Sequence, residues 1–231
     1  LHLAPYPCAQ ENLIAEGIEP DKILVIGNTG LDGQDQMLAH GADADTPWLP
    51  DGKFTLVTLH RRENIGARLE ATCRRLIAVL ERQPDLNILW PVHPNPKVRG
   101  TVFEFFGDLK DRVRLIEPLD YPKFLCAQEA AAFVVSDSGG VQEEAASMGT
   151  RVAIVRKKTE RPDAVALGLT RIVGADAAGL IEATDEFISV PVDPTAVAAW
   201  RELQGDGKAS IAAAAAIVDE VESNHTARRR A

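Results

Sequence analysis

The sequence predicts an α/β fold whose main part is a Rossmann-like, doubly wound parallel sheet. Short, continuously apolar runs recur along the chain, as expected for strands buried on both faces of a sheet. Amphipathic segments separate these runs; in Ala67–Gln83, for example, Leu69, Cys73, Leu76 and Leu80 can share one helical face. This alternation is typical of parallel sheets covered by helices on both sides. The predicted strands are Ile23–Ile26, Phe54–Leu59, Leu86–Trp90, Val113–Ile116, Ala131–Ser136 and Val152–Val155.

A segment rich in Gly, Asp and Pro, Gly41–Lys53, is predicted to be a linker. From there to about Val190, the pattern is that of one doubly wound domain. Near the C-terminus, the alanine-rich segment "SIAAAAAI" is predicted to be a helix suited to close packing.

Composition and charge exclude several classes of protein. With 231 residues, 45% of them hydrophobic, the chain can form one large domain, or one domain plus parts of another. A net charge of −9 argues against a general nucleic-acid binder, and Arg228–Arg230 is predicted to be a solvated tail. Cys8, Cys73 and Cys126 lack metal-site spacing and are predicted to be small core residues in a reducing compartment. We find neither a membrane-spanning apolar stretch nor a signal peptide in the sequence, and we expect a cytoplasmic protein.

The loop after the predicted strand Phe54–Leu59 carries His60, Arg61 and Arg62 in succession. Ligands of such sheets bind at the carboxyl ends of the strands. Two arginines beside a histidine can bind an anion and supply a titratable proton. The alternative is a solvated strand end whose charges are paired locally.

The loop after the next strand contains His93 between prolines. Pro94 favours an extended backbone at His93, while Asn95 and Pro96 have the pattern of a helix N-cap followed by the first helical residue. His93 is therefore expected beside a helix N-terminus. It could serve a binding site there, or it could simply cap the helix.

A third loop, in "VVSDSGGVQEEAASMG", combines glycines with acid. Gly139 and Gly140 allow close backbone approach, and a helix that starts there directs free N–H groups at an anion, to which Ser138 adds a hydroxyl. Glu144, one turn further, would repel a phosphate but could accept hydrogen bonds from a ribose diol. The pattern therefore favours a nucleotide over free phosphate. The alternative is a tight strand–helix turn with a solvated glutamate.

A fourth loop, "VRKKTERPDAV", is basic. Pro162 is well placed as the first residue of a helix, which puts Arg161 at the N-terminal end of that helix, where it could clamp a diphosphate. Lys157 and Lys158 add positive charge, although loop lysines are most often only solvated. All four loops are predicted to lie at one edge of the same sheet.

Six segments together resemble the non-hydrolysing UDP-N-acetylglucosamine 2-epimerases in order and approximate spacing. They are "GNTGLD", "LVTLHRREN", "PVHPNPKVR", "DSGGVQEEA", "KTERPDAVALG" and "GDGKAS". The resemblance covers nearly the whole chain. It implies a glycosyltransferase-B architecture, with two Rossmann-like domains and the active site between them. It also implies interconversion of UDP-N-acetylglucosamine and UDP-N-acetylmannosamine, by elimination and re-addition of UDP, for polysaccharide biosynthesis.

By resemblance, His60 would be the catalytic residue, and the remaining site residues would hold UDP. Ser138, Gly139 and Gly140 would contact the diphosphate together with Arg161, and Glu144 would contact the ribose. Phe124, with the loop Pro118–Phe124, would border the uracil, and His93 would line the nucleotide site. No metal or cofactor is predicted.

The resemblance also predicts the domain organisation. Residues 1–35 would close a largely missing N-terminal domain, residues 36–203 would form the UDP-binding domain, and residues 204–231 would form a crossover helix and tail. The carboxylates that act at C2 would lie in the missing part, so we expect a truncated or split chain with weak UDP binding and little activity alone. A separately encoded N-terminal partner and a homodimer are expected. The alternatives are a hydrolysing epimerase, a nucleotide-sugar transferase or a non-catalytic UDP-sugar-binding module.

Overall fold

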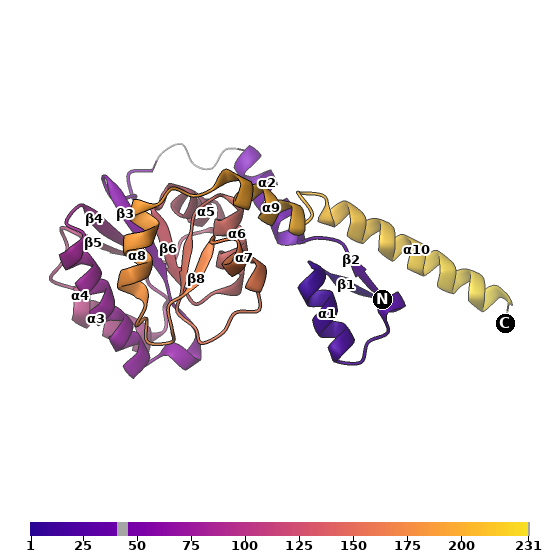
Figure 1. Cartoon of the computed structure of the whole chain (residues 1–231), viewed down its shortest axis with the longest axis horizontal. Coiled ribbons are helices and arrows are strands. Elements are labelled where there is room, and N and C mark those ends of the chain that lie inside the picture. The colour runs from indigo at the N-terminus through magenta and orange to yellow at the C-terminus, as the bar shows by residue number, and fades with distance from the viewer. Residues whose placement is uncertain (41–45, 231) are drawn as a thin grey trace. The chain divides into compact units, whose positions relative to one another are not determined.

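The computed structural model describes residues 1–40 and 46–230, with side chains to residue 222. The chain forms two compact units, shown with their elements in Figure 1. One unit comprises His40–Val197, and the other combines Leu1–Ala39 with Ala198–Ala231. Five residues of the predicted linker, 41–45, lie outside the described residues.

The larger unit contains a six-stranded sheet, all of whose paired strands run parallel, in the order β5-β4-β3-β6-β7-β8. This confirms the predicted parallel α/β fold. Five of its strands were predicted within a few residues, while β8 was missed because its three residues form no extended apolar run. The strands are β3 (Lys53–Thr58), β4 (Leu86–Pro91), β5 (Val113–Ile116), β6 (Phe133–Ser136), β7 (Val152–Ile154) and β8 (Thr170–Ile172).

Helices cover both faces of this sheet (Figure 1). On one face, the cores of β3, β4 and β6 pack against α3, α4 and α8; on the other, they pack against α5 and α6. The predicted helix Ala67–Gln83 is found as α3, and its expected apolar face is buried. The helical segments of this unit are η2 (Arg62–Asn64), α3 (Ala67–Arg82), α4 (Pro96–Phe106), α5 (Tyr121–Ala130), α6 (Gly139–Ser147), α7 (Pro162–Ala166) and α8 (Leu180–Ser189), and α9 (Pro194–Leu203) begins in it.

The smaller unit has a two-stranded parallel sheet, of which only the second strand was predicted. In this unit, the motif "GNTGLD" near the N-terminus meets the segment that leads into "GDGKAS" near the C-terminus. A side chain at Gly27 would lie only 2.6 Å from the Gln204 carbonyl oxygen, so the close approach of the two segments requires glycine. The Asn28 N–H donates to the same carbonyl (2.7 Å). The elements of this unit are β1 (His2–Ala4), α1 (Pro7–Ala15), η1 (Pro20–Lys22), β2 (Ile23–Val25), α2 (Thr29–Ala39) and α10 (Ala209–Arg230).

Helix α10 contains the predicted alanine-rich segment. The buried carboxylate of Asp32 accepts from the backbone N–H groups of Ala209 and Ser210, which fixes the start of the helix. Further along, Ile211 and Val221 are among its exposed apolar side chains. Within the described residues, we find no helix long and apolar enough to cross a membrane.

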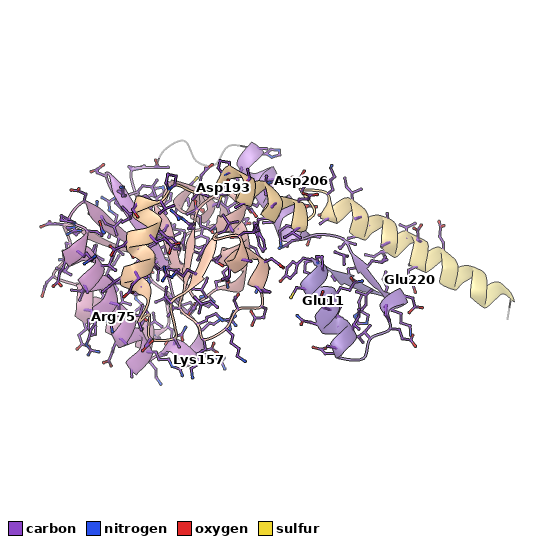
Figure 2. All side chains as sticks on the ribbon, in the orientation of Figure 1. Glu11, Arg75, Lys157, Asp193, Asp206 and Glu220 are labelled. Carbon is purple, nitrogen blue, oxygen red and sulfur yellow. The ribbon has the colours of Figure 1, made fainter. Side chains whose placement is uncertain are left out.

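Surface charge on the larger unit is carried by long side chains that project from the ribbon, among them Arg75 on α3 and Lys157 after β7 (Figure 2). Both residues are exposed. Lys157 follows the carboxyl end of a central strand, and the loops at that end of the sheet contain the predicted site.

Candidate functional site

The site lies where the strand order of the six-stranded sheet reverses direction. Strands β3 and β6 are neighbours, but the chain leaves them toward opposite edges, through β4 and β5 on one side and β7 and β8 on the other. In open α/β sheets, such a reversal leaves a crevice at the carboxyl ends of the strands, and ligands bind there. His60 follows β3, and Asp137 and Ser138 follow β6.

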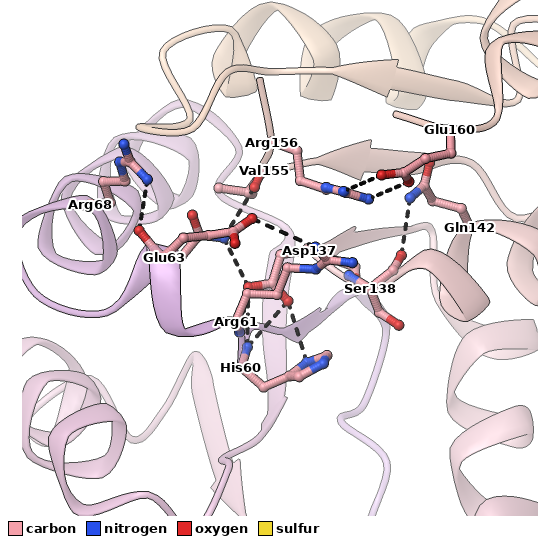
Figure 3. Close-up of polar contacts among 12 residues, drawn as sticks. His60, Arg61, Glu63, Arg68, Asp137, Ser138, Gln142, Val155, Arg156 and Glu160 are labelled. Atoms are coloured by element: carbon pink, nitrogen blue, oxygen red, sulfur yellow. Dashed lines mark hydrogen bonds and ion pairs between the residues drawn. The ribbon is translucent and has the colours of Figure 1, made fainter. Parts of the chain in front are cut away.

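Asp137 organises the loop after β3 (Figure 3). Its carboxylate is fully buried and accepts from the backbone N–H groups of His60 (3.2 Å) and Arg61 (3.0 Å) and from the side-chain amide of Asn64 (2.9 Å). The same amide also donates to the Val155 carbonyl (3.2 Å). The loop is therefore fastened to both β6 and β7.

The His60 ring is oriented by the same carboxylate. Its Nδ1 lies 3.3 Å from Asp137, and the His60 side chain remains 43% exposed. A carboxylate beside Nδ1 orients the ring, so that Nε2 is the nitrogen directed away from Asp137.

His93 lies beside His60, with ring centroids 6.1 Å apart and ring planes 20° apart. Its Nδ1 accepts from the Asn95 N–H (3.1 Å), and the Asn95 side chain caps α4, as the sequence predicted for that residue. Both rings line a cavity of about 240 Å³, which brings together residues from the loops after β3, β4 and β5. The cavity is lined by Thr58, His60, Pro91, His93, Pro94, Pro118, Leu119 and Phe124.

The turn from β6 into α6 meets the loop after β7. Ser138 is the N-cap of α6, and its hydroxyl makes no capping hydrogen bond. A side chain at Gly139 would lie 3.0 Å from the Arg161 guanidinium nitrogens, whereas one at Gly140 would meet nothing within 4 Å. The guanidinium therefore lies directly against the N-terminus of α6, where free N–H groups and positive charge favour an anion.

Arg161 is held there by contacts with α6. Its Nε donates to Glu143 (2.6 Å), and both side chains are less than one-fifth exposed. Gln142 donates to the Ser138 carbonyl (3.1 Å) and accepts from the Thr159 hydroxyl (2.7 Å), which joins the Arg161 loop to the glycine turn. The position of Arg161 is thus fixed before any ligand arrives, and little entropy remains to be lost on binding.

Glu144 faces α5. Its two carboxylate oxygens accept from the Tyr121 hydroxyl (3.1 Å) and the Gln128 amide (3.0 Å). Burial raises the pKa of Glu144 above its ordinary value, although these two hydrogen bonds oppose the shift. The pKa of Tyr121 is also raised, chiefly by burial and further by the neighbouring carboxylate.

The structure thus places the predicted site residues at the carboxyl edge of one sheet. His60, His93 and Phe124 share the cavity, and Gly139 contacts Arg161. Ser138, Gly140 and Glu144 lie on the β6–α6 turn and the helix that follows it. Their assigned roles stay predictions.

Sequence reasoning missed the residues that support this set. Asp137, Asn64, Gln142 and Glu143 all lie within the quoted motifs, but none was given a role. For Asp137 a signal existed, because a carboxylate directly after an apolar strand and before Ser-Gly-Gly has to be satisfied by neighbouring loops. We find no cluster of His, Cys, Asp and Glu suited to a metal ion within the described residues.

Fold and site together define an α/β protein of the glycosyltransferase-B type. The UDP-forming α,α-trehalose-phosphate synthase of Burkholderia xenovorans shares this fold at a TM-score of 0.64 and 10% identity. The UDP-N-acetylglucosamine 2-epimerase family profile matches residues 1–218. The chain belongs to this family, which confirms the resemblance.

Relatives match over most of this chain but over little more than half of their own length. The UDP-N-acetylglucosamine 2-epimerase of Escherichia coli K12 is 35% identical over 218 residues, which cover 90% of this chain and 58% of the relative. A crystal structure of the Neisseria meningitidis enzyme bound to UDP-N-acetylglucosamine matches with a TM-score of 0.83 and 31% identity, covering 94% of this chain and 61% of that one. The chain therefore spans about 58% of the length of such curated relatives.

Proposed function

We propose that this chain forms the UDP-binding part of a non-hydrolysing UDP-N-acetylglucosamine 2-epimerase. The observation that carries the proposal is the contact of the Arg161 guanidinium with Gly139 at the start of α6. A helix N-terminus, an open glycine and a fixed arginine form a site for a diphosphate. The cavity that contains His60, His93 and Phe124, at the same carboxyl edge of the sheet, receives part of the nucleotide sugar in this proposal.

Within this proposal, each part of UDP has a partner of suitable chemistry. The diphosphate is held by the N–H groups of Gly139 and Gly140, the Ser138 hydroxyl and Arg161. The ribose hydroxyls donate to Glu144, whose carboxylate is already oriented by Tyr121 and Gln128. The uracil packs against Phe124 and the loop Pro118–Phe124, and His93 presents a ring to the nucleotide.

The reaction we propose proceeds by elimination and re-addition. A base removes the proton from C2 of the sugar, the C1–oxygen bond breaks, and its electron pair leaves with UDP. Return of a proton to the other face of C2 and of UDP to C1 completes the inversion. The His60 ring, oriented by Asp137, is placed to donate a hydrogen bond to the negative charge on departing UDP. The groups that act on C2 are not among the residues we assign.

The binding half of the proposal is tested by calorimetry with UDP. We expect the purified chain to bind UDP, and His60→Asn to bind it with about the same affinity, since His60 is assigned to the leaving group in the transition state. Absence of heat at millimolar UDP would contradict the proposal.

Turnover is tested by hydrogen–deuterium exchange at C2 of the sugar, with this chain supplemented by the N-terminal part of an epimerase. We expect His60→Asn to reduce exchange by roughly 100-fold or more, within the range of general acid–base contributions. Equal losses of UDP affinity and of rate would contradict the role given to His60. Product analysis for free UDP in stoichiometric amount distinguishes hydrolysis or transfer from epimerisation.

The proposal also places the protein in the cytoplasm, with a homodimer and an N-terminal partner as its expected associations. Burial raises the pKa of the Cys73 thiol to about 12, so that it stays protonated and unreactive.

A further inference from the structure

A second cavity, of about 360 Å³, lies at the same sheet edge but on the side of α3. It is formed by the loop after β3, the start of α3 and the loops after β7 and β8. None of the residues predicted to hold UDP lines it. Its lining residues are Glu63, Asn64, Arg68, Arg156, Lys157, Lys158 and Ala175.

The charges around this cavity are unbalanced. The Glu63 carboxylate pairs with Arg61 (3.6 Å), and Arg156 forms a two-pronged pair with Glu160 (2.7 and 2.9 Å), so these two charges are compensated. By contrast, no carboxylate in the described part of the chain pairs with Arg68, Lys157 or Lys158. The Arg68 guanidinium donates to the Glu63 carbonyl (2.7 Å), which carries no charge.

Three uncompensated cations around one concavity repel each other in the absence of a ligand. They are also unexpected in a chain of net charge −9. A concave surface lined by one sign of charge concentrates counter-ions of the opposite sign. Its volume falls within the range of small-molecule sites, about 300–1,000 Å³. The guanidinium of Arg68 suits paired oxygens, and the two ammonium groups act as point charges.

We propose that this cavity binds a small multivalent oxyanion of the diphosphate class, at a site separate from the UDP cradle. Binding is carried by Arg68, Lys157 and Lys158. The cavity wall also contains Asn64, whose amide donates to Asp137, the residue that orients His60. Two residues, Asn64 and Asp137, therefore lie between an anion bound here and the His60 ring.

The test is calorimetric titration of the 231-residue chain with inorganic diphosphate, in magnesium-free buffer, with and without saturating UDP. The test variant is Lys157→Gln/Lys158→Gln. The matched control is Lys22→Gln/Lys53→Gln, which removes the same charge from exposed lysines outside the cavity. All four lysines are exposed, so neither variant threatens the core.

We expect diphosphate to bind in the presence of UDP. The test variant should bind it about fivefold to tenfold more weakly, as expected from two exposed ion pairs, and the control should be nearly unchanged. Added salt should weaken binding. Equal weakening in both variants would show non-specific attraction and overturn the proposal, as would absence of heat at millimolar diphosphate.

Nuclear magnetic resonance locates the bound anion. We expect diphosphate to shift the side-chain amide signal of Asn64 in the wild type and to shift it less in the test variant. Shifts confined to Gly139 and Arg161 would place the anion in the UDP cradle and overturn the proposal. Failure of UDP itself to bind would contradict the proposed function but not the proposal of a second anion site. The comparison of the two lysine variants with diphosphate would still test that second site.

Discussion

His60 and His93 have nearly parallel rings in one cavity, yet their ring nitrogens are held by different kinds of contact. His60 Nδ1 faces the buried carboxylate of Asp137, which lies 77 positions along the chain. His93 Nδ1 accepts from the N–H of Asn95, only two positions away. His60 is therefore held from across the sheet and His93 from within its own loop, so the two rings of one site differ in the range of the contacts that position them.

The largest expected effect comes from breaking the long-range contact. The buried carboxylate of Asp137 accepts hydrogen bonds from several N–H groups. In Asp137→Asn, the side-chain N–H₂ replaces one of the two acceptor oxygens, so some of these N–H groups face another donor. We expect a loss of roughly 3 kcal/mol in the free energy of unfolding, because the buried donors lose their charged partner. Urea denaturation measures this loss.

Asn95 supplies the control for that variant, because its substitution keeps the backbone N–H that contacts His93. Asn95→Ala removes the cap of α4 beside His93 and should cost about 1 kcal/mol. Nuclear magnetic resonance of the histidine rings should show a displaced His60 signal in Asp137→Asn alone. If the His60 signal were displaced equally in both variants, Asp137 would not be the residue that positions the His60 ring.

On the phosphate side of the site, the close approach of Gly139 and Arg161 is a second case of support from another loop. Gly139→Ala places a methyl group 3.0 Å from the guanidinium, so we expect Arg161 to move and UDP affinity to fall about tenfold, the loss of one charge-assisted contact. Gly100→Ala on α4 is the matched control, because its methyl group meets nothing within 4 Å and Gly100 has no assigned part in binding. Calorimetry with UDP compares the two, and equal affinities would show that the arginine is not needed where it lies.

The smallest expected effect concerns Glu144, which α5 supports through Tyr121 and Gln128. Burial raises the pKa of Glu144 in the folded chain, so the folded state binds the proton more tightly than the unfolded state. The contribution of this group to the free energy of unfolding therefore falls as the pH rises through the window from its ordinary value to its raised one. Glu144→Gln has no carboxyl group at this position, so its free energy of unfolding lacks this fall with pH.

The stability of Glu144→Gln relative to the wild type should accordingly rise with pH in the range that begins near the ordinary glutamate pKa, about 4.3, and extends upward to the raised pKa. Urea denaturation across this range measures the difference. A difference that stays constant or falls with rising pH would contradict the expectation.

Sequence patterns predicted the parallel sheet because its central strands are continuous apolar runs, and they located the loops because glycine, proline and histidine follow these runs. Strands β1 and β8 were missed because each includes a polar residue and forms no continuous apolar run, unlike the equally short β2 and β7. The link between Asn64 and Asp137 could not be predicted from either loop alone. It depends on β3 and β6 being adjacent, although 73 positions separate the two residues in the chain.

One carboxylate, that of Asp137, both fastens the loop after β3 and aligns the ring of His60. A small molecule designed to push this ring aside would also have to unfasten the backbone around it, which makes the ring a stiff wall of the cavity. The ring of His93 is instead fastened by an N–H of its own loop, and it forms the wall that an inhibitor could reshape at lower cost.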